Sequence, residues 1–207
     1  MYETIFRHFP LLSDSQKDKL SGLKKIYDRW NSMINVISRK DMDNFMVHHV
    51  LHSMAIGKVI TFLPGTKILD VGTGGGFPGI PLAILFPDSE FTLLDSIEKK
   101  IKVVSAVAEE LKLNNVIPLR KRVEDEKNKY HFVVSRAVSE FRSFVRMTSK
   151  NIDKSGSNSL HNGILYLKGG DLSVELSSFE NKVTVVNINS LFDDPYFETK
   201  KIVYLPV

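Results

Sequence analysis

Hydrophobic residues recur at helical spacing through the first third of the chain. In the first pattern they are three or four residues apart and share one helix face: Leu20, Leu23, Tyr27, Trp30, Ile34 and Ile37. Ser13 has a side chain suited to capping the start of this helix. A second pattern begins near Asp41 and ends before the break at Leu63-Pro64-Gly65. We therefore expect residues 1–63 to form a helical N-terminal extension.

From Lys67 onward, short apolar runs alternate with helical segments. The runs predict seven strands, at 68–71, 91–95, 116–119, 131–135, 164–168, 182–189 and 201–205. Helices are predicted at 78–86, 97–111 and 139–150, and the Ser/Asn/Gly-rich residues 154–163 predict a loop. This alternation favours an α/β, Rossmann-like fold with a mostly parallel seven-stranded sheet and an antiparallel pair at its edge. We expect residues 64–207 to form this core and to make one compact domain with the extension.

Composition narrows the chemistry available to the chain. Its 207 residues include no cysteine, which excludes disulfides, cysteine-ligated zinc, iron–sulfur clusters and a thiolate nucleophile. There are 28 basic and 24 acidic residues, and the net charge of +4 is compatible with a phosphate-bearing partner. No apolar run approaches the roughly 18 residues of a membrane span, and the N-terminus lacks a secretory pattern. We expect a cytoplasmic, monomeric protein that does not bind membranes.

A glycine-rich segment between the first core strand and the next helix carries the strongest chemical signal. It reads Asp70-Val71-Gly72-Thr73-Gly74-Gly75-Gly76-Phe77-Pro78-Gly79. Glycines at such a turn let the backbone bend sharply and approach a ligand closely. The spacing Gly74-x-Gly76-x-x-Gly79 also occurs in dinucleotide sites, but here the strand ends before Gly72, which displaces that frame.

Two aspartates at strand ends bear on the choice of ligand. Asp70 closes the first core strand, where a carboxylate would repel a pyrophosphate but favour the sulfonium and ammonium groups of S-adenosylmethionine. Asp95 closes the second strand, where an acid accepts hydrogen bonds from ribose hydroxyls or, alternatively, caps the following helix. Asp70 therefore favours S-adenosylmethionine over a nicotinamide or flavin cofactor, whereas Asp95 fits either.

Further candidates follow the third and fourth core strands. Arg122-Val123-Glu124 lies where an adenine ring would sit in this architecture, with a solvated Glu124 as an equal alternative. Ser135-Arg136-Ala137 follows the fourth strand, toward which a transferred methyl group would point. The Asp/Asn-Pro-Pro-aromatic run of adenine amino methyltransferases is missing there. Asp194-Pro195-Tyr196-Phe197 resembles that run only in part and is interpreted as a turn.

Together these motifs resemble the ribosomal RNA small subunit methyltransferase G family, also called glucose-inhibited division protein B. The matching segments keep the family's order: Trp30-Asn31 with Asn35, Asp70 to Leu82, Phe91 to Ser96, Arg122-Val123-Glu124, Ser135-Arg136-Ala137 and Leu167-Lys168-Gly169-Gly170. The resemblance implies a class I S-adenosylmethionine-dependent methyltransferase acting on N7 of a guanine in the decoding-region loop of 16S rRNA. Its partner would be that rRNA, the small ribosomal subunit or a precursor. By the family's pattern, the methyl donor would contact Gly72, Phe77, Val123, Glu124 and Arg136.

The second helical segment departs from the family's pattern. Family members usually have Arg-His and Asp-Ser pairs there, whereas this chain reads His48-His49-Val50-Leu51-His52-Ser53. The acid is replaced by His52, which leaves open any role of this segment in RNA contact or charge balance. His48 and His52 have the i, i+4 spacing of metal ligands, but no further pattern supports a site, so no metal is expected.

The chemistry of the implied target guides the remaining predictions. Guanine N7 has an exposed lone pair and no proton, so we predict no catalytic base and a positioning role for Arg136. Phosphate contacts are predicted for Lys99, Lys100, Arg142, Arg146 and Lys201. Arg142, Arg146 and Lys150 would form one basic stripe on a helix, with a solvated helix face as the equal alternative.

Three other functions compete with this interpretation. The chain could methylate another RNA, a protein or a small molecule, or it could be a nicotinamide-dependent reductase. It could also be an RNA-binding module without catalytic activity, against which the intact glycine loop with Asp70 and Asp95 speaks.

Overall fold

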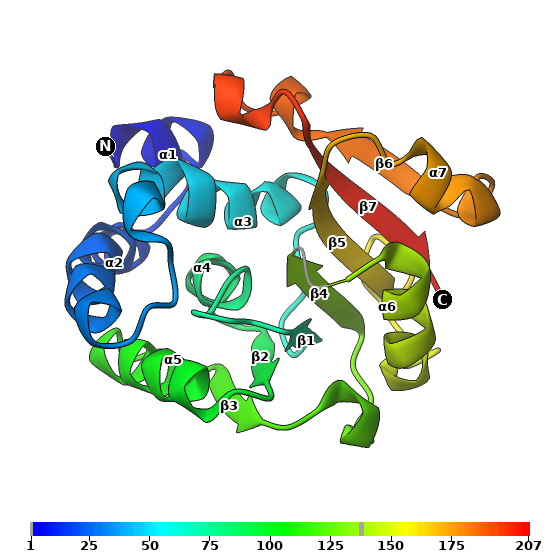
Figure 1. Ribbon diagram of the computed structural model, residues 1–207, viewed down its shortest axis with the longest axis horizontal. Helices are drawn as coiled ribbons and strands as arrows, with labels where there is room; N and C mark the ends of the chain where they lie inside the picture. Colours follow the sequence, from blue (N-terminus) through cyan, green and yellow to red (C-terminus); the bar gives the residue numbers. More distant parts are fainter. Residues whose placement is uncertain (1, 137–138) are drawn as a thin grey trace.

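The computed structural model describes residues 2–136 and 139–207, which contain one seven-stranded sheet (Figure 1). Its strands are β1 (Lys67–Val71), β2 (Glu90–Asp95), β3 (Val116–Arg120), β4 (Phe132–Arg136), β5 (Gly163–Gly169), β6 (Thr184–Asn187) and β7 (Lys200–Pro206). Their order is β3-β2-β1-β4-β5-β7-β6, and β7 runs antiparallel to both β5 and β6 while the other neighbours are parallel. The predicted α/β fold with an antiparallel edge pair is confirmed.

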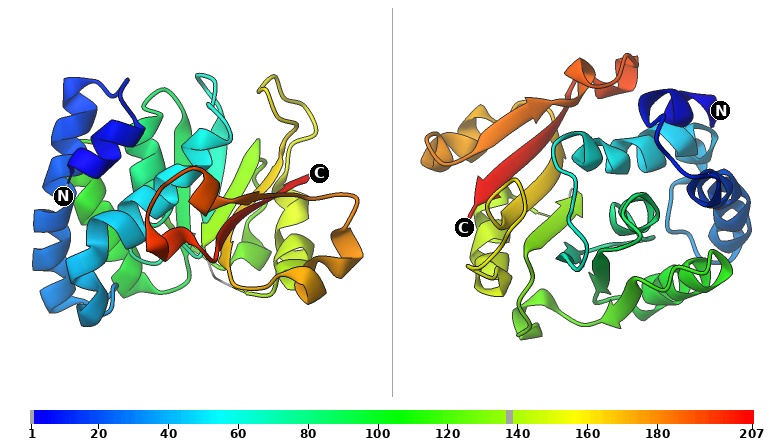
Figure 2. Two further views of the ribbon diagram at one scale, coloured as in Figure 1. Left: turned by 90° about the horizontal axis from the view of Figure 1, so that it is seen from above. Right: turned by 180° about the vertical axis from the view of Figure 1, so that it is seen from behind.

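Helices cover both faces of the sheet (Figures 1 and 2). The α-helices are α1 (Glu3–His8), α2 (Asp14–Met33), α3 (His52–Met54), α4 (Gly79–Leu85), α5 (Glu98–Glu110), α6 (Phe141–Thr148) and α7 (Ser173–Leu176). On one face α4 and α5 pack against the strands, α3 packs beside α4, and α2 packs on both α4 and α5. On the other face lie α6 and α7. Buried side chains of the extension and of the first face, such as Leu23, Val50 and Phe91, join in one cluster.

Short helices fill several connections. They are η1 (Arg39–Asn44), the π-helix η2 (Met46–Leu51), η3 (Ala55–Lys58), η4 (Val123–Asp125), η5 (Ser149–Asn151), η6 (Ser177–Phe179), η7 (Ile188–Ser190) and η8 (Pro195–Phe197). The turn predicted at Pro195-Tyr196 is thus η8, capped by the side chain of Asp194. No helix among the described residues is long and apolar enough to cross a membrane.

The start of α2 shows why the extension packs on the core. Ser13 caps this helix as predicted, because its hydroxyl accepts from the Gln16 N–H and the Gln16 side chain accepts from the Ser13 N–H. The Gln16 amide also donates to the carbonyls of Ile84 and Leu85, 3.0 and 2.9 Å away. Those carbonyls belong to the end of α4, so one side chain satisfies two helix termini.

The end of α2 differs from the sequence-based prediction. Ile34 and Ile37 continue the apolar spacing, yet the helix ends at Met33 because the backbone of Ile34 is extended. The side-chain oxygen of Asn31 accepts from the N–H groups of Val36 and Ile37, and its amide donates to the Ile37 carbonyl. Asn31 thereby replaces helical hydrogen bonds with its own and turns the chain back, while Ile37 still becomes buried.

The remaining differences concern element lengths. The second helical segment of the extension is a succession of η1, η2, α3 and η3 rather than one α-helix. The helix predicted at 139–150 is α6, which ends at Thr148, so Lys150 lies in η5 and not on the same helix as Arg142. The strand predicted at 182–189 is shortened to β6, since residues 188–190 form η7.

Candidate functional site

A cavity of about 550 Å³ opens at the carboxyl ends of β1, β2 and β4. Its walls are formed by Val71, Gly72, Leu94, Asp95, Ser96, Ile97, Lys100, Lys121, Arg122, Val123, Glu124, Arg136 and Met147. In open parallel sheets, ligands bind in such a crevice beyond the strand ends. Five of the residues predicted to bind the cofactor therefore come together here: Gly72, Asp95, Val123, Glu124 and Arg136.

The glycine loop forms the floor of this cavity next to β1. Gly72 has a φ of +67°, a left-handed conformation that favours glycine, and its N–H donates to the Leu94 carbonyl. Gly79 begins α4 beside the buried Asp70, and a Cβ atom there would lie 2.7 Å from Asp70 Oδ2. The loop thus needs glycine both for its backbone angles and for close packing.

Asp70 lies beneath the loop, and its side chain does not line the cavity. Its Oδ2 accepts from the Thr73 hydroxyl at 2.6 Å and from the Gly79 N–H at 2.8 Å. Burial raises the pKa of Asp70 to about 7, although these hydrogen bonds oppose the increase. The carboxyl therefore ties β1 to the start of α4, and any effect on a cationic ligand would act through space rather than by contact.

Asp95 faces the cavity from the end of β2. Its Oδ2 accepts from the Gly74 N–H at 3.0 Å and its Oδ1 from the Ile97 N–H at 2.9 Å, and Lys100 Nζ is 3.6 Å from Oδ2. The residue at the N-cap of α5 is Ile97, so Asp95 shapes the turn before the helix rather than capping it directly. Each carboxylate oxygen keeps a further lone pair for a ligand hydroxyl.

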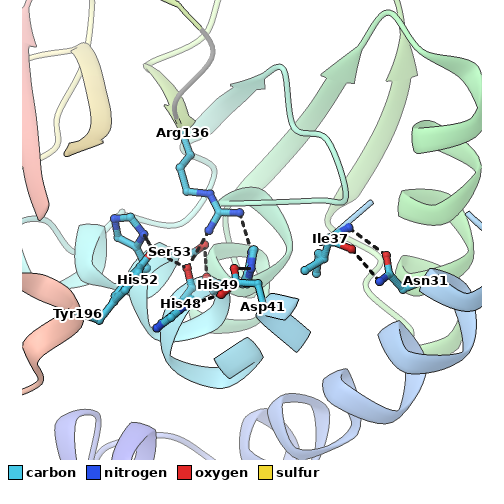
Figure 3. Close-up of polar contacts among 9 residues, drawn as sticks. All are labelled: Asn31, Ile37, Asp41, His48, His49, His52, Ser53, Arg136 and Tyr196. Carbon is cyan, nitrogen blue, oxygen red and sulfur yellow. Dashed lines mark hydrogen bonds and ion pairs between the residues drawn. The ribbon is translucent and has the colours of Figure 1, made fainter. Parts of the chain in front are cut away.

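The opposite wall comes from η4 and the end of β4. Val123 is buried and Glu124 exposed, and the Glu124 carbonyl accepts a hydrogen bond from Lys150. Arg136 extends from β4 toward the short helices of the extension, as Figure 3 shows. Its guanidinium carbon lies 5.2 Å from the centre of the Phe77 ring. Phe77 does not line the cavity and reaches it only through Arg136.

The donor set of this cavity suits S-adenosylmethionine. Apolar side chains of Leu94, Ile97 and Val123 offer a surface for a purine ring, and Asp95 offers an acceptor for ribose hydroxyls. Arg136 and Lys100 supply cations for the carboxylate of an amino acid. Among the described residues, the walls hold two acids, Asp95 and Glu124, and four cations, Lys100, Lys121, Arg122 and Arg136, so charge alone does not separate this donor from a pyrophosphate.

The residues predicted to contact RNA lie in different surroundings. Lys99 is exposed on α5, and Arg142 and Arg146 are exposed one turn apart on α6. Lys201 on β7 donates to the Gly170 carbonyl at 2.7 Å. Lys100 lines the cavity beside Asp95, so its position is that of a cofactor contact.

Sequence reasoning did not predict eight of the thirteen described cavity residues as cofactor contacts, among them Ile97, Lys121 and Met147, and it missed the contacts of the histidines. Ile97 is 42 % exposed, and an apolar residue two positions after the strand-ending Asp95 could have indicated a ligand surface. Lys121 and Met147 carried no comparable signal. His48 Nδ1 is 2.5 Å from Asp41 Oδ1, and His52 Nδ1 is 3.3 Å from the Tyr196 hydroxyl. Over 2–136 and 139–207, no three potential ligands are arranged to hold a metal.

Solved structures share this fold. Magnesium protoporphyrin IX methyltransferase from Synechocystis PCC 6803, with bound S-adenosylmethionine, superposes with a TM-score of 0.58 at 15% identity, covering 95% of this chain and 99% of that one. An S-adenosylmethionine-dependent methyltransferase from Aquifex aeolicus also gives 0.58, at 16% identity over 82% and 98%. These likenesses show that the chain has the fold of class I S-adenosylmethionine-dependent methyltransferases.

Sequence comparison identifies the family within this class. Residues 16–197 match the family model of rRNA small subunit methyltransferase G (GidB). Proteins named ribosomal RNA small subunit methyltransferase G are 53% identical in Flavobacterium psychrophilum and 51% in Flavobacterium johnsoniae, each over 99% of this chain and 98% of the relative. The protein of that name from Bacteroides thetaiotaomicron is 48% identical over 98% of both. The chain belongs to the rRNA small subunit methyltransferase G family.

Proposed function

We propose that this protein methylates N7 of a guanine in the decoding-region loop of 16S rRNA, with S-adenosylmethionine as donor. The observation that carries the proposal is full-length similarity to rRNA small subunit methyltransferases, combined with a cavity suited to the donor. Its partner would be the rRNA, the small ribosomal subunit or a precursor of it. The protein would act as a monomer in the cytoplasm. Guanine N7 has no proton to lose, so methylation there needs no general base. This agrees with the cavity, whose described walls include the acids Asp95 and Glu124 and several cations but no histidine.

The residues of the cavity would divide the work of binding and orientation. Asp95 would accept from the ribose, and Val123 and Glu124 would lie along the adenine. Gly72 and Gly74 would let the backbone approach the donor, and Arg136 would orient it. Bound S-adenosylmethionine supplies an electrophilic methyl group on a sulfonium. The protein has to hold guanine N7 in line with that methyl and keep water out.

Two further residues would act on the donor indirectly. Asp70 would hold the glycine loop against α4 through its contacts with Thr73 and Gly79. Phe77 would support Arg136 with its ring. The phosphate backbone of the RNA would meet the exposed cations Lys99, Arg142 and Arg146, and Lys201 would contribute from β7.

Methyl transfer to defined substrates tests this proposal. The protein is incubated with labelled S-adenosylmethionine and unmodified small-subunit rRNA, free and as assembled particles, and the modified base is mapped. We expect transfer to guanine N7 in at least one of these substrates, and none with Gly72→Arg, whose side chain would fill the donor cavity. Transfer to another base, or to none, would refute guanine-N7 methylation.

A further inference from the structure

One guanidinium connects the cofactor cavity to the N-terminal extension. Arg136 lines the cavity at the end of β4, and its side chain enters a polar cluster on η1 and η2 (Figure 3). Its Nη1 donates to the His48 carbonyl at 3.1 Å, and its Nη2 lies 2.9 Å from His49 Nδ1. A guanidinium has more N–H groups than these two contacts use, so Arg136 can hold the extension and a ligand together.

The direction of these hydrogen bonds determines where His49 carries its proton. A guanidinium only donates, so His49 Nδ1 must accept and be unprotonated. The proton of the neutral ring is then on Nε2, which donates to Asp41 Oδ2 at 2.6 Å. The other oxygen of Asp41 is 2.5 Å from His48 Nδ1, so adjacent histidines share one carboxylate.

Charge and burial favour the same arrangement. Burial and the nearby Arg136 lower the pKa of His49 to about 4, despite the opposing effect of Asp41, so its ring is neutral at pH 7. Partial burial alone would raise the pKa of Asp41, but hydrogen bonds from His48 and His49 lower it below its usual value. Phe45 stacks with the His49 ring at 6.0 Å, and Phe77 lies against His49 at 5.3 Å. These rings pack on the His49 side chain, which is 12 % exposed, whereas the Asp41 side chain is 32 % exposed.

We propose that His49 is a positioning residue for Arg136, and that Asp41 sets the tautomer of His49 that Arg136 requires. This inference rests on the proposed function, because it takes Arg136 to be a contact of the methyl donor. An arginine side chain loses much rotamer freedom when a ligand orders it. His49 and the His48 carbonyl order the guanidinium beforehand, so the donor meets a group already in place.

Two substitutions of His49 separate its contacts. In His49→Asn the amide oxygen lies near the position of Nδ1, so it keeps an acceptor for Arg136 but does not reach Asp41. In His49→Gln the amide lies near the position of Nε2, so it keeps a donor to Asp41 but loses the acceptor for Arg136. We expect His49→Asn to bind S-adenosylhomocysteine within about threefold of the parent and His49→Gln to bind about tenfold more weakly, as measured by calorimetry. Equal affinities in the two variants would overturn the proposal.

Nitrogen-15 NMR of the histidine rings tests the tautomer of His49 that these hydrogen bonds require. The chain has 6 histidines, and the His49 signals are those that disappear in His49→Asn. We expect a neutral ring protonated at Nε2 in the ligand-free protein, and a mixture of tautomers only when both neighbours are removed in Asp41→Ala/Arg136→Met, because either neighbour alone favours a proton on Nε2. A ring protonated at Nδ1 in the parent would refute the proposal, since such a ring cannot accept from Arg136.

A matched control lies at the other end of the same strand. His131 precedes β4, and its Nδ1 accepts from the Lys67 N–H at 2.9 Å. His131→Asn should leave the affinity for S-adenosylhomocysteine unchanged, and a decrease as large as that of His49→Gln would contradict a specific role of His49. Because neither readout contains RNA, failure of guanine methylation would leave both tests intact. If the parent binds no S-adenosylhomocysteine, the proposed function fails, and the NMR tautomer then tests only the hydrogen bond between His49 and Arg136.

Discussion

The hydroxyl of Tyr27 donates to the carbonyl of Gly75 at 2.5 Å and so ties α2 to the glycine loop. Tyr27 is fully buried, and burial raises the pKa of its hydroxyl far above the ordinary value, so the group stays protonated. A Cβ atom on Gly75 would lie 3.1 Å from Val36, which packs on the same side of the loop. The extension therefore supports the outer side of a loop whose Gly72 faces the cavity.

Removing this hydroxyl tests whether the extension shapes the donor site. Tyr27→Phe leaves the Gly75 carbonyl buried without its partner, which should lower the free energy of unfolding by about 1–3 kcal/mol. Because the loop would lose its support, the affinity for S-adenosylhomocysteine should also fall. Denaturant unfolding and calorimetry measure the two effects. Tyr204 is the matched control, because its hydroxyl donates to the His161 carbonyl at 2.7 Å outside the cavity. If Tyr204→Phe weakens binding as much as Tyr27→Phe, the loop is not the cause.

The buried Asp70 should make stability depend on pH. Its folded pKa of about 7 lies above the unfolded value of about 3.9, so between these values the folded state binds more protons. Its contribution therefore destabilises the protein progressively as pH rises from 4 to 7, by on the order of 4 kcal/mol, and is constant above pH 8. Urea unfolding of the parent and of Asp70→Asn across this range measures the difference. A difference that does not change with pH would show that Asp70 titrates normally.

Two glycine substitutions should change stability in opposite directions. A Cβ atom on Gly79 would lie 2.7 Å from Asp70 Oδ2 and 2.7 Å from Leu93 Cγ, so Gly79→Ala should destabilise by about 1–3 kcal/mol. On Gly22 in α2 the nearest atom of a Cβ would be Leu111 Cδ2 at 3.8 Å, an ordinary contact. Gly22→Ala should stabilise by about 0.5–1 kcal/mol, because alanine favours helix interiors. Chemical denaturation measures both, and stabilisation by Gly79→Ala would contradict the packing described.

If the exposed cations of α6 contact RNA phosphates, their removal should change the salt dependence of RNA binding. If Arg142 and Arg146 each contact a phosphate, the double change to alanine should weaken binding and reduce the slope of log affinity against log salt by about 1.4–1.8. Filter binding to the small-subunit rRNA between low and moderate salt measures the slope. The double variant Lys19→Ala/Lys25→Ala on α2, across the sheet from α6, should leave the slope unchanged. An unchanged slope in the α6 variant would assign that helix face to solvent.

The predictable part of the fold comes from local patterns. The ends of β1 at Val71 and of β2 at Asp95 followed directly from the apolar runs, the first of which stops at the glycine loop. Beyond Met33 the apolar pattern predicted the wrong structure. Ile37 keeps the helical spacing, but the side chain of Asn31 accepts hydrogen bonds from the backbone of Val36 and Ile37 and ends the helix. A hydrophobic period records which side of the chain is buried, and a burial pattern alone does not distinguish a helix from a folded-back turn.

The sequence by itself determined the family, the glycine loop and the acids at the strand ends, because each depends on residues that are neighbours along the chain. Only the tertiary structure decided which of them face the cavity. It placed Asp70 beneath the loop and brought Lys100 beside Asp95. It also joined Arg136 to His49 and Asp41. Those contacts link residues far apart in the chain, and they arise because burial of apolar side chains packs the extension against the ends of the strands.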